Sequence, residues 1–495
     1  MSYLCGKLCS TILLEHFGPI VQKVGDCLFQ NDSQTLFFIR RHTSLPMEKI
    51  KESLCVLIKF GLVTFDQQGK LFWYKIHSEK IITMLRYSRF MFFIKKCSGD
   101  ECEIIFEEIL KQGNETASQV IIKTYQKIAQ VSQEPSVENL VNKFQLLVKN
   151  QFLIRNINDK PEKSINSCEF DMPKLNISSI IKKIQGIEAD PGDSKIYWKV
   201  NFDRLIQDLR DEIVVSAVER MIDNHASELM RQLIYLMYTR TASWVDTSNP
   251  IPYHEIKDKV KNLNAPELYD YLDQYLQLLV DDPRRFVKRV GDSGGGQFCV
   301  DMKEAFAQLA WATIENIVLE RFGSKAARIF RLVRSEKFIE QQHIHELIMF
   351  PVKEAKDLTY ALLEKNYLKM QEIKKMNASA APSKIFYLFH IDINQVVRME
   401  IEHCYHALYN TIQRRNHEIS SNKRMMDKNI RLQTLISNLK EHGAPEDQIE
   451  QMEKLITPSE QTQLDKVQKT IKTLGGAELY IEDTLFLLTM YLRYH

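Results

Sequence analysis

Residues 46–76, PMEKIKESLCVLIKFGLVTFDQQGKLFWYKI, decide the fold because they join an amphipathic helix to a β-hairpin. Their apolar residues recur at helical spacing: Ile50, Leu54, Leu57 and Ile58. Pro46 occupies the expected first helical position and Gly61 ends the helix. Two apolar runs, at residues 62–65 and 71–76, then flank a Gln-Gln-Gly turn, as in a hairpin. A helix followed by such a hairpin is the second half of a winged helix.

The same order of helix, strand, polar tip and strand recurs at residues 136–157, 265–302 and 350–391. A single short periodic segment is ambiguous, whereas a repeated supersecondary unit restricts the fold. We therefore predict a mainly α-helical chain with small β-wings, built from four tandem winged-helix domains. Winged helices mostly bind nucleic acids or other proteins, so this architecture argues against small-molecule catalysis.

The pattern changes after residue 391. Apolar residues then recur every three or four positions, stop at residues 442–445, and return with Ile449, Met452 and Ile456 and onward to residue 474. Two antiparallel helices zipped by heptads fit this pattern. Residues 457–460, TPSE, have the form of a capping box, so the returning helix either kinks or begins again there. A short apolar helix near residues 479–491 must cover either the base of the hairpin or a partner.

These boundaries predict seven parts of the chain: winged helices at residues 1–80, 81–157, 201–303 and 304–392, a linker or insertion at 158–200, a coiled-coil hairpin at 393–475 and a C-terminal helix at 476–495. The linker rests on the clustering of Pro, Ser and Gly between residues 156 and 196.

Composition sets limits on the class of protein. The 495 residues carry a net charge of only +2, so a nucleic-acid surface must be a local patch rather than a global field. The nine cysteines are odd in number and form no CxxC pair, which favours a reducing compartment with free thiols. The apolar stretch at residues 485–492 is too short to span a bilayer, and the N-terminus lacks a signal-peptide pattern. We expect a soluble, intracellular protein with no membrane partner.

One segment invites a catalytic interpretation. Residues 291–296, GDSGGG, resemble the nucleophile segment of trypsin-like proteases, with Ser293 as the nucleophile. That chemistry needs a histidine base and an aspartate that orients it, normally supported by two β-barrels. A flexible wing tip explains the glycines better in a mostly helical chain. We therefore expect no catalytic residue here.

Histidine clusters raise the possibility of a metal site. His403, Cys404 and His406 lie together, as do His343 and His345. Two residues do not make a closed four-ligand zinc site, and no second pair follows at zinc-finger spacing. Phosphate-binding and dinucleotide-binding glycine motifs are also absent from the sequence. We expect packed or solvated histidines, no metal and no cofactor.

Two basic clusters are stronger candidates for a functional surface. The first lies on the expected first strand of the third wing, and the second recurs every three or four residues on helices of the fourth unit. Our candidate DNA-contacting residues are Arg284, Arg285, Lys288, Arg289, Arg321, Lys325, Arg328 and Arg331, with Arg334 and Lys337 continuing the second series. They have few acidic neighbours in the sequence. Such runs can be solvated faces or phosphate contacts, and both interpretations stay open.

Two weaker basic signals lie in the first two units, at residues 40–42 (RRH) and at residues 95–96 (KK). Aromatic residues precede the second: Tyr87, Phe90, Phe92 and Phe93. They could stack on nucleic-acid bases, although packing between the first two units is the simpler interpretation.

Several stretches now resemble a known family. LCSTILLEHFG at residues 8–18, KESLCVL with its hairpin at 51–57 and MLRYSRF at 84–90 are similar to the large winged-helix subunit of eukaryotic RNA polymerase III. The resemblance covers the whole chain, including the four winged helices, the hairpin and the terminal helix.

The resemblance implies a non-catalytic subunit of a nuclear polymerase. It implies a detachable heterotrimer with two smaller subunits on the clamp side of the polymerase core, which supports promoter recruitment and DNA opening and binds single-stranded DNA. No active-site residue carries over from the family, so the basic candidates above rest on the residues alone. The alternative is a free-standing winged-helix transcription factor related to the large subunit of general factor E.

Overall fold

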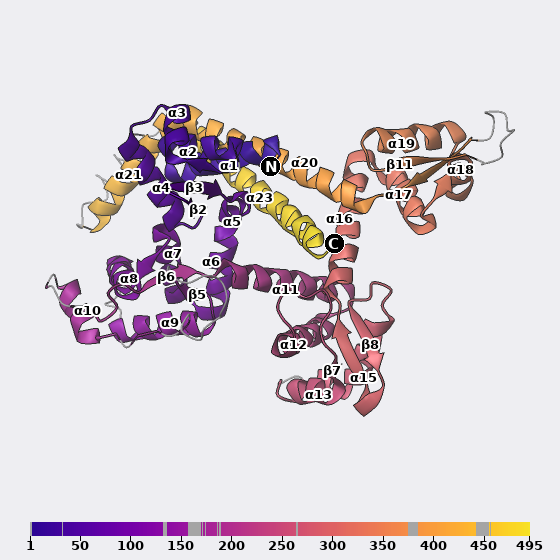
Figure 1. Cartoon of the computed structure of the whole chain (residues 1–495), viewed down its shortest axis with the longest axis horizontal. Helices are drawn as coiled ribbons and strands as arrows, with labels where there is room; N and C mark the ends of the chain where they lie inside the picture. The colour runs from indigo at the N-terminus through magenta and orange to yellow at the C-terminus, as the bar shows by residue number, and fades with distance from the viewer. Residues whose placement is uncertain are drawn as a thin grey trace. The chain divides into compact units, whose positions relative to one another are not determined.

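The computed structural model of the chain describes residues 2–31, 33–131, 136–156, 170, 172–173, 175–185, 187, 190–263, 266–374, 385–441, 455 and 457–495. The chain divides into two compact units (Figure 1). Unit 1 comprises Met1–Leu209 and Leu408–Leu479, and unit 2 comprises Arg210–Ala407 and Tyr480–His495. The described part contains no helix that is both long enough and apolar enough to cross a membrane.

Four three-stranded sheets in the described residues share one topology. In each sheet the last strand of the wing lies in the middle, between the other wing strand and a two-residue strand from earlier in the chain. The orders are β1-β3-β2, β4-β6-β5, β7-β9-β8 and β10-β12-β11, and the pairs are antiparallel. This repetition confirms the predicted fold class, mainly α with small β-wings.

The first winged helix of unit 1 is built from four helices and one hairpin. The helices are α1 (Tyr3–Phe17), α2 (Pro19–Gln30), α3 (Leu36–Thr43) and α4 (Met47–Lys59). The short strand β1 (Gln34–Thr35) precedes α3, and β2 (Val63–Gln68) and β3 (Leu71–Ile76) form the wing. Pro46 lies one residue before α4 rather than inside it. Ile50, Leu54 and Leu57 are buried, as their spacing predicts.

The second winged helix uses a different stretch of chain for its wing than we expected. Its helices are α5 (Ser78–Thr83), η1 (Met84–Arg86), α6 (Tyr87–Ser98), α7 (Asp100–Gln112), α8 (Ala117–Val131) and α9 (Val137–Lys149). The strand β5 (Leu153–Arg155) pairs with β6 (Tyr197–Val200), which also pairs with β4 (Glu115–Thr116). The expectations of a return strand before residue 157 and of a linker running to residue 200 are therefore wrong at these points.

A physical reason lies in the core of this domain. Trp198 on β6 is fully buried, and its ring lies edge-on to Phe144 at 5.8 Å between centroids. The insertion also contains α10 (Ile177–Ile184), whose Ile180 is buried in the same core. Loop closure costs grow slowly with length, so a long insertion between two wing strands is tolerated. The second wing strand was therefore expected too early in the sequence, directly after β5 rather than at residues 197–200.

The aromatic residues of α6 mostly pack inside the second winged helix. Tyr87 stacks on Phe202 with ring centroids 5.5 Å apart, and Phe90 is fully buried. Phe93 contacts Phe152 edge-on at 6.1 Å, whereas Phe92 is exposed. Three of the four aromatic residues thus serve the core of this domain.

The third winged helix lies in unit 2 from residue 210 onward. Its elements are α11 (Phe202–Met221), which begins in unit 1, α12 (Asn224–Arg240), β7 (Ile251–Pro252), α13 (Tyr253–Lys261), α14 (Pro266–Asp270), α15 (Leu272–Asp281), β8 (Val287–Gly291), η3 (Ser293–Gly295) and β9 (Gln297–Val300). The helical stretch that precedes this wing is interrupted at Tyr271, so it forms the two helices α14 and α15.

The fourth winged helix follows directly. Its elements are α16 (Met302–Phe322), α17 (Ser324–Glu336), β10 (Ile339–Glu340), α18 (Gln341–Ile348), α19 (Val352–Glu364), β11 (Lys369–Lys374) and β12 (Ile385–His390). Lys369 to Lys374 pair in register with His390 to Ile385, so this wing is a regular antiparallel hairpin.

The described residues after the fourth winged helix form three long helices: α20 (Ile393–Ser421), α21 (Lys423–Glu441) and α23 (Pro458–Tyr494). The predicted capping box is confirmed, because the Thr457 backbone N–H donates to Glu460 Oε2 at 3.0 Å and the Glu460 N–H donates to Thr457 Oγ1 at 3.3 Å. The predicted positions Ile449, Met452 and Ile456 lie outside the described residues.

The expected boundary between the hairpin and a separate terminal helix is wrong. Figure 1 shows α23 as one uninterrupted helix, which continues through Gly475 and Gly476. Leu485, Leu488 and Tyr491 are buried, so the apolar end of α23 is covered by other parts of this chain. Burial of this face offsets the low helix propensity of two glycines.

Candidate nucleic-acid interface

The basic cluster of the third wing is largely matched by carboxylates. Arg284 and Arg285 precede β8 rather than lying on it, and Arg284 Nη1 is 4.0 Å from Asp282 Oδ2. Lys288 forms an ion pair with Asp301, and Arg289 Nη2 is 2.9 Å from Asp292 Oδ1. Asp282 and Asp292 belong to the same domain, and Asp301 is the N-cap residue of α16, which follows it. The positive field of this cluster is therefore partly neutralised within the fold.

The cluster of the fourth unit is matched in the same way. Lys325 pairs with Glu354 on α19, and Arg331 pairs with Glu315 on α16. The guanidinium of Arg328 lies over the Phe350 ring, 5.1 Å from its centroid. The sequence shows few acidic neighbours because these partners come from other helices. Six of the eight candidates thus have a carboxylate within 4.0 Å in the described residues, since Arg321 also lies close to Glu400.

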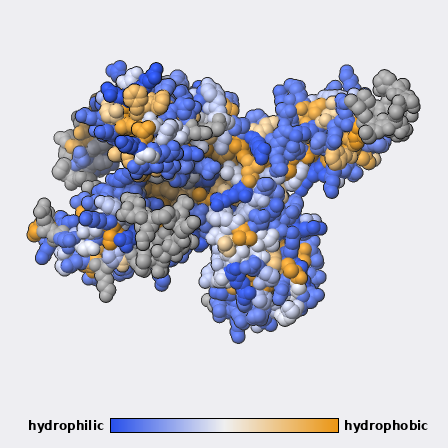
Figure 2. Space-filling model, in the orientation of Figure 1, coloured by the Kyte–Doolittle hydropathy of each residue, from blue (hydrophilic) through white to orange (hydrophobic). Residues whose placement is uncertain are grey.

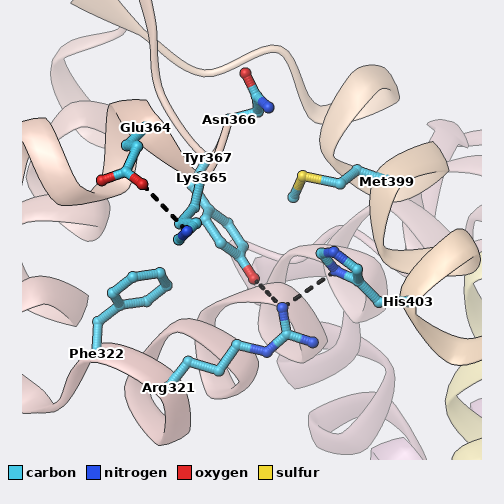
Figure 3. A pocket seen from close by; sticks show the side chains of 8 residues that line it. All are labelled: Arg321, Phe322, Glu364, Lys365, Asn366, Tyr367, Met399 and His403. Atoms are coloured by element: carbon cyan, nitrogen blue, oxygen red, sulfur yellow. Dashed lines mark hydrogen bonds and ion pairs between the residues drawn. The ribbon is translucent and has the colours of Figure 1, made fainter. Parts of the chain in front are cut away.

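Arg321 belongs to a hydrogen-bond network at the end of α16 (Figure 3). Its Nη1 donates to the Tyr367 hydroxyl at 2.9 Å and lies 3.1 Å from His403 Nδ1. The Tyr367 hydroxyl donates to Glu400 Oε1 at 2.5 Å, and Arg321 Nη2 is 3.5 Å from Glu400 Oε2. Glu400, on α20, is 1% exposed. A buried carboxylate is stable only when it is paired and hydrogen-bonded, as it is here.

The network raises the pKa of Tyr367, first through burial and then through its hydrogen bond to Glu400. It joins three elements of unit 2: α16, the turn after α19, and α20. The adjoining pocket of about 340 Å³ is lined by Arg321, Phe322, Glu364, Lys365, Asn366, Tyr367, Met399 and His403 (Figure 3). Its two cations both have carboxylate partners, Arg321 with Glu400 and Lys365 with Glu364 at 3.2 Å, so the geometry gives Arg321 a structural role at the base of the fourth winged helix.

Ser293 lies where a wing tip was expected. It begins the short turn η3 between β8 and β9, and its Oγ accepts a hydrogen bond from Gln297 Nε2 at 3.1 Å. Gly294 has φ +67, and a Cβ on Gly295 would lie 3.1 Å from Tyr253 Cδ1. The neighbouring Asp292 is paired with Arg289. The glycines thus serve a tight turn that packs against a tyrosine ring.

His403, in the first histidine cluster, has hydrogen-bond and ion-pair partners within the fold. His403 contacts Arg321 and lies 3.4 Å from Glu400, and Cys404 is buried, which raises the pKa of its thiol to about 12. Within the ranges that the structure describes, no group of three His, Cys, Asp or Glu side chains has a geometry suited to a metal ion.

Two arginines that the sequence analysis did not identify form hydrogen bonds between the long helices and other elements. Arg210 in unit 2 is fully buried, and its guanidinium donates to Asp211, to the Tyr238 hydroxyl and, at 2.7 Å, to the Tyr494 hydroxyl. Arg415 in unit 1 bonds both Glu15 and Glu478. An arginine inside an otherwise apolar helical period is the signal that could have found them.

Comparison with known families finds four stretches of the chain that match family models. Residues 7–68 match the model of the RNA polymerase III subunit RPC82 helix-turn-helix domain, and residues 122–309 match RNA polymerase III subunit RPC82. Residues 314–391 match the POLR3C C-terminal winged-helix domain, and residues 424–487 match the helical hairpin domain of DNA-directed RNA polymerase III subunit RPC3. The last match extends past residue 475, in keeping with an uninterrupted α23.

Full-length relatives give the same result. The chain is 34% identical over 525 residues to DNA-directed RNA polymerase III subunit RPC3 of Bos taurus and of Homo sapiens, with 98% of each chain covered. The corresponding protein of Danio rerio is 33% identical over 530 residues, again with 98% of each chain covered. The resemblance seen in the sequence motifs is confirmed. The chain belongs to the RPC3 family of DNA-directed RNA polymerase III subunits.

Proposed function

We propose that the chain acts as a non-catalytic subunit of nuclear RNA polymerase III. In this proposal it joins two smaller subunits in a detachable heterotrimer, which binds the clamp side of the polymerase core and supports promoter recruitment and DNA opening. The observation that carries the proposal is the similarity to RPC3 proteins over 98% of both chains. The similarity includes every winged helix and the hairpin.

The surface of the fourth winged helix supports a protein-binding role. Around the turn between α18 and α19, Leu347 is 57% exposed, Met349 88% and Val352 48%. Met349 also has φ +59, a conformation that methionine rarely adopts. Exposed apolar groups gathered at one turn are typical of a contact that is completed by another protein. We propose that this turn contacts a polymerase subunit.

Accessory binding of single-stranded DNA is the second part of the proposal. It should be weak, salt-sensitive and indifferent to sequence, because phosphate contacts carry affinity without base readout. Arg285 and Arg328 are the two of the eight candidates without a carboxylate within 4.0 Å in the described residues. They are the candidates from these two clusters best placed to contribute.

Affinity purification of the tagged chain from nuclear extract tests the assembly. We expect the polymerase core and two small subunits in equal amounts with the chain, and release of the three-subunit set as one species at raised salt. Recovery of the chain without polymerase would instead favour a free-standing factor related to general factor E.

A further inference from the structure

The first winged helix differs in charge from the third. Residues 36–76, which form α3, α4 and the wing, contain seven Lys or Arg and three Asp or Glu. The corresponding residues 253–300 of the third winged helix contain seven and eight. The first domain therefore has a local positive excess in a chain whose net charge is only +2.

These seven cations are also free to contact a ligand. All seven are exposed, and none lies within 4.0 Å of a carboxylate oxygen in the described part of the chain. Arg40 and Arg41 lie in the last turn of α3, Lys49 and Lys51 lie on α4, and Lys70 is at the wing tip. By contrast, six of the eight cations first proposed for DNA contact are ion-paired. Unpaired cations release counterions when they meet phosphates, whereas paired ones must first lose their partners.

Aromatic rings are exposed among these cations. Phe37 and Phe38 on α3 are 69% and 46% exposed, and Phe65 and Phe72 on the wing are 51% and 44% exposed. Figure 2 shows a hydrophobic patch in the region of α3, bordered by hydrophilic surface. The rings of Phe37 and Phe38 are 6.4 Å apart and inclined by 79°, so they are not stacked face to face on each other. Accessible ring faces beside cations are the elements of a stacking platform for single strands.

We propose that α3 and the wing of the first winged helix bind single-stranded DNA, with Phe37 and Phe38 stacking on bases and Arg40 and Arg41 contacting phosphates. The proposal rests on the accessory DNA binding proposed above and moves its main site out of the third and fourth units. A protein partner is less favoured because five of the seven cations are lysines. Lysine is depleted at the centres of protein interfaces, whereas it serves well as a phosphate ligand.

The test uses the purified full-length chain and a fluorescent 20-mer of deoxythymidine. In one variant Arg40 and Arg41 become Gln. We expect weaker binding at low salt and a plot of log affinity against log salt whose slope is shallower by about 1.4, because each lost phosphate contact removes about 0.7 from it. The matched control replaces Arg284 and Arg289 with Gln, and its salt slope should change little.

A second pair of variants separates stacking from apolar docking. Replacing Phe37 and Phe38 with Leu keeps apolar surface but removes the ring faces, and should weaken binding about tenfold. Replacement with Trp should restore or strengthen it. Phe92→Leu is the control, because Phe92 is 67% exposed on α6 beside Lys95, whose charge is paired with Glu103 at 2.9 Å. Circular dichroism of each variant checks that the fold is kept.

The outcomes are distinguishable. If the parent chain does not bind the oligonucleotide at low salt, the proposed DNA binding and this site both fail. If the parent binds and the α3 variants bind equally well, the site is wrong while accessory DNA binding stands. If the Leu variant binds DNA like the parent but no longer recovers the polymerase core, α3 is a protein-docking surface.

Discussion

Glu15 on α1 accepts two hydrogen bonds from the guanidinium of Arg415 on α20, although 400 positions separate them in the sequence. The Nη1–Oε1 distance is 2.9 Å and the Nη2–Oε2 distance is 3.1 Å. Arg415 Nε also donates to Glu478 on α23 at 2.8 Å. One arginine thus ties the first winged helix to both arms of the hairpin within unit 1, and its carboxylate partners raise the pKa of its guanidinium against the effect of burial.

Arg415→Ala should destabilise unit 1, because two half-buried carboxylates lose their shared partner. The expected cost is about 1–3 kcal/mol, less than for a fully buried pair because these groups keep some solvent contact. Hydrogen exchange of α1 and the thermal midpoint measure the effect. Arg414→Ala is the matched control: Arg414 is 62% exposed and, among the described residues, pairs only with Glu418 on the same helix, so the change should affect stability little. Equal exchange in both variants would contradict the proposed tie.

Trp198→Ala should destabilise the second winged helix by about 3–5 kcal/mol, because it removes a fully buried ring from the core. Tyr197→Ala is the control on the same strand, since Tyr197 is 42% exposed. Thermal unfolding of this domain can be monitored by the rate of proteolysis within α8 and α9. If the two variants lose equal stability, β6 is not part of the domain core.

The wing of the second winged helix could be predicted only in part from the sequence. The hairpin of β2 and β3 was predictable because a Gln-Gln-Gly turn lies directly between its strands. The strand β6 pairs with β5 across an insertion, and no local pattern indicates such a distant partner. The same limit applies to the basic candidates. Helical spacing identified Lys325 and Arg331, but their partners Glu354 and Glu315 lie on other helices.

Charge reversal should therefore have unequal effects on the fourth winged helix. Arg331→Glu places a carboxylate against Glu315 and should lower stability by about 0.5–1 kcal/mol. Arg328→Glu loses only its contact with the Phe350 ring and should cost less. Chemical denaturation of both variants measures the difference. Equal midpoints would mean that the pair between α16 and α17 contributes nothing in solution.

Asp392 should make the stability of the N-terminal end of α20 depend on pH in the acid range. It pairs with Lys369 on β11 at 2.7 Å and accepts the Gln395 backbone N–H at 3.3 Å, and the hydrogen bond from Lys369 lowers the pKa of its carboxyl below the ordinary 3.8. The stabilisation is complete above the ordinary value and is lost as pH falls through the lower value in the folded chain.

Thermal melting of the parent and of Asp392→Asn between pH 7 and pH 2 tests this sign. We expect the parent to be more stable at pH 7, with the difference shrinking once pH falls below about 4. A difference that stays constant over this range would show that the Lys369 pair does not affect the carboxyl.

Ser293→Ala should leave polymerase assembly and DNA binding unchanged, because Ser293 Oγ has a glutamine amide as its partner rather than a base. Treatment of the parent with a fluorophosphonate probe is the companion measurement. Covalent labelling at Ser293 would contradict its assignment to a wing tip.

We propose that the chain acts in initiation and contributes nothing to the chemistry of RNA synthesis. Polymerase III depleted of the chain, then supplied with it again, measures this directly on two templates. We predict that RNA extension on a preassembled RNA–DNA scaffold continues without the chain, while promoter-dependent transcription stops and returns when the chain and its small partners are restored. Loss of extension on the scaffold, or promoter-dependent transcription in the chain's absence, would contradict the account.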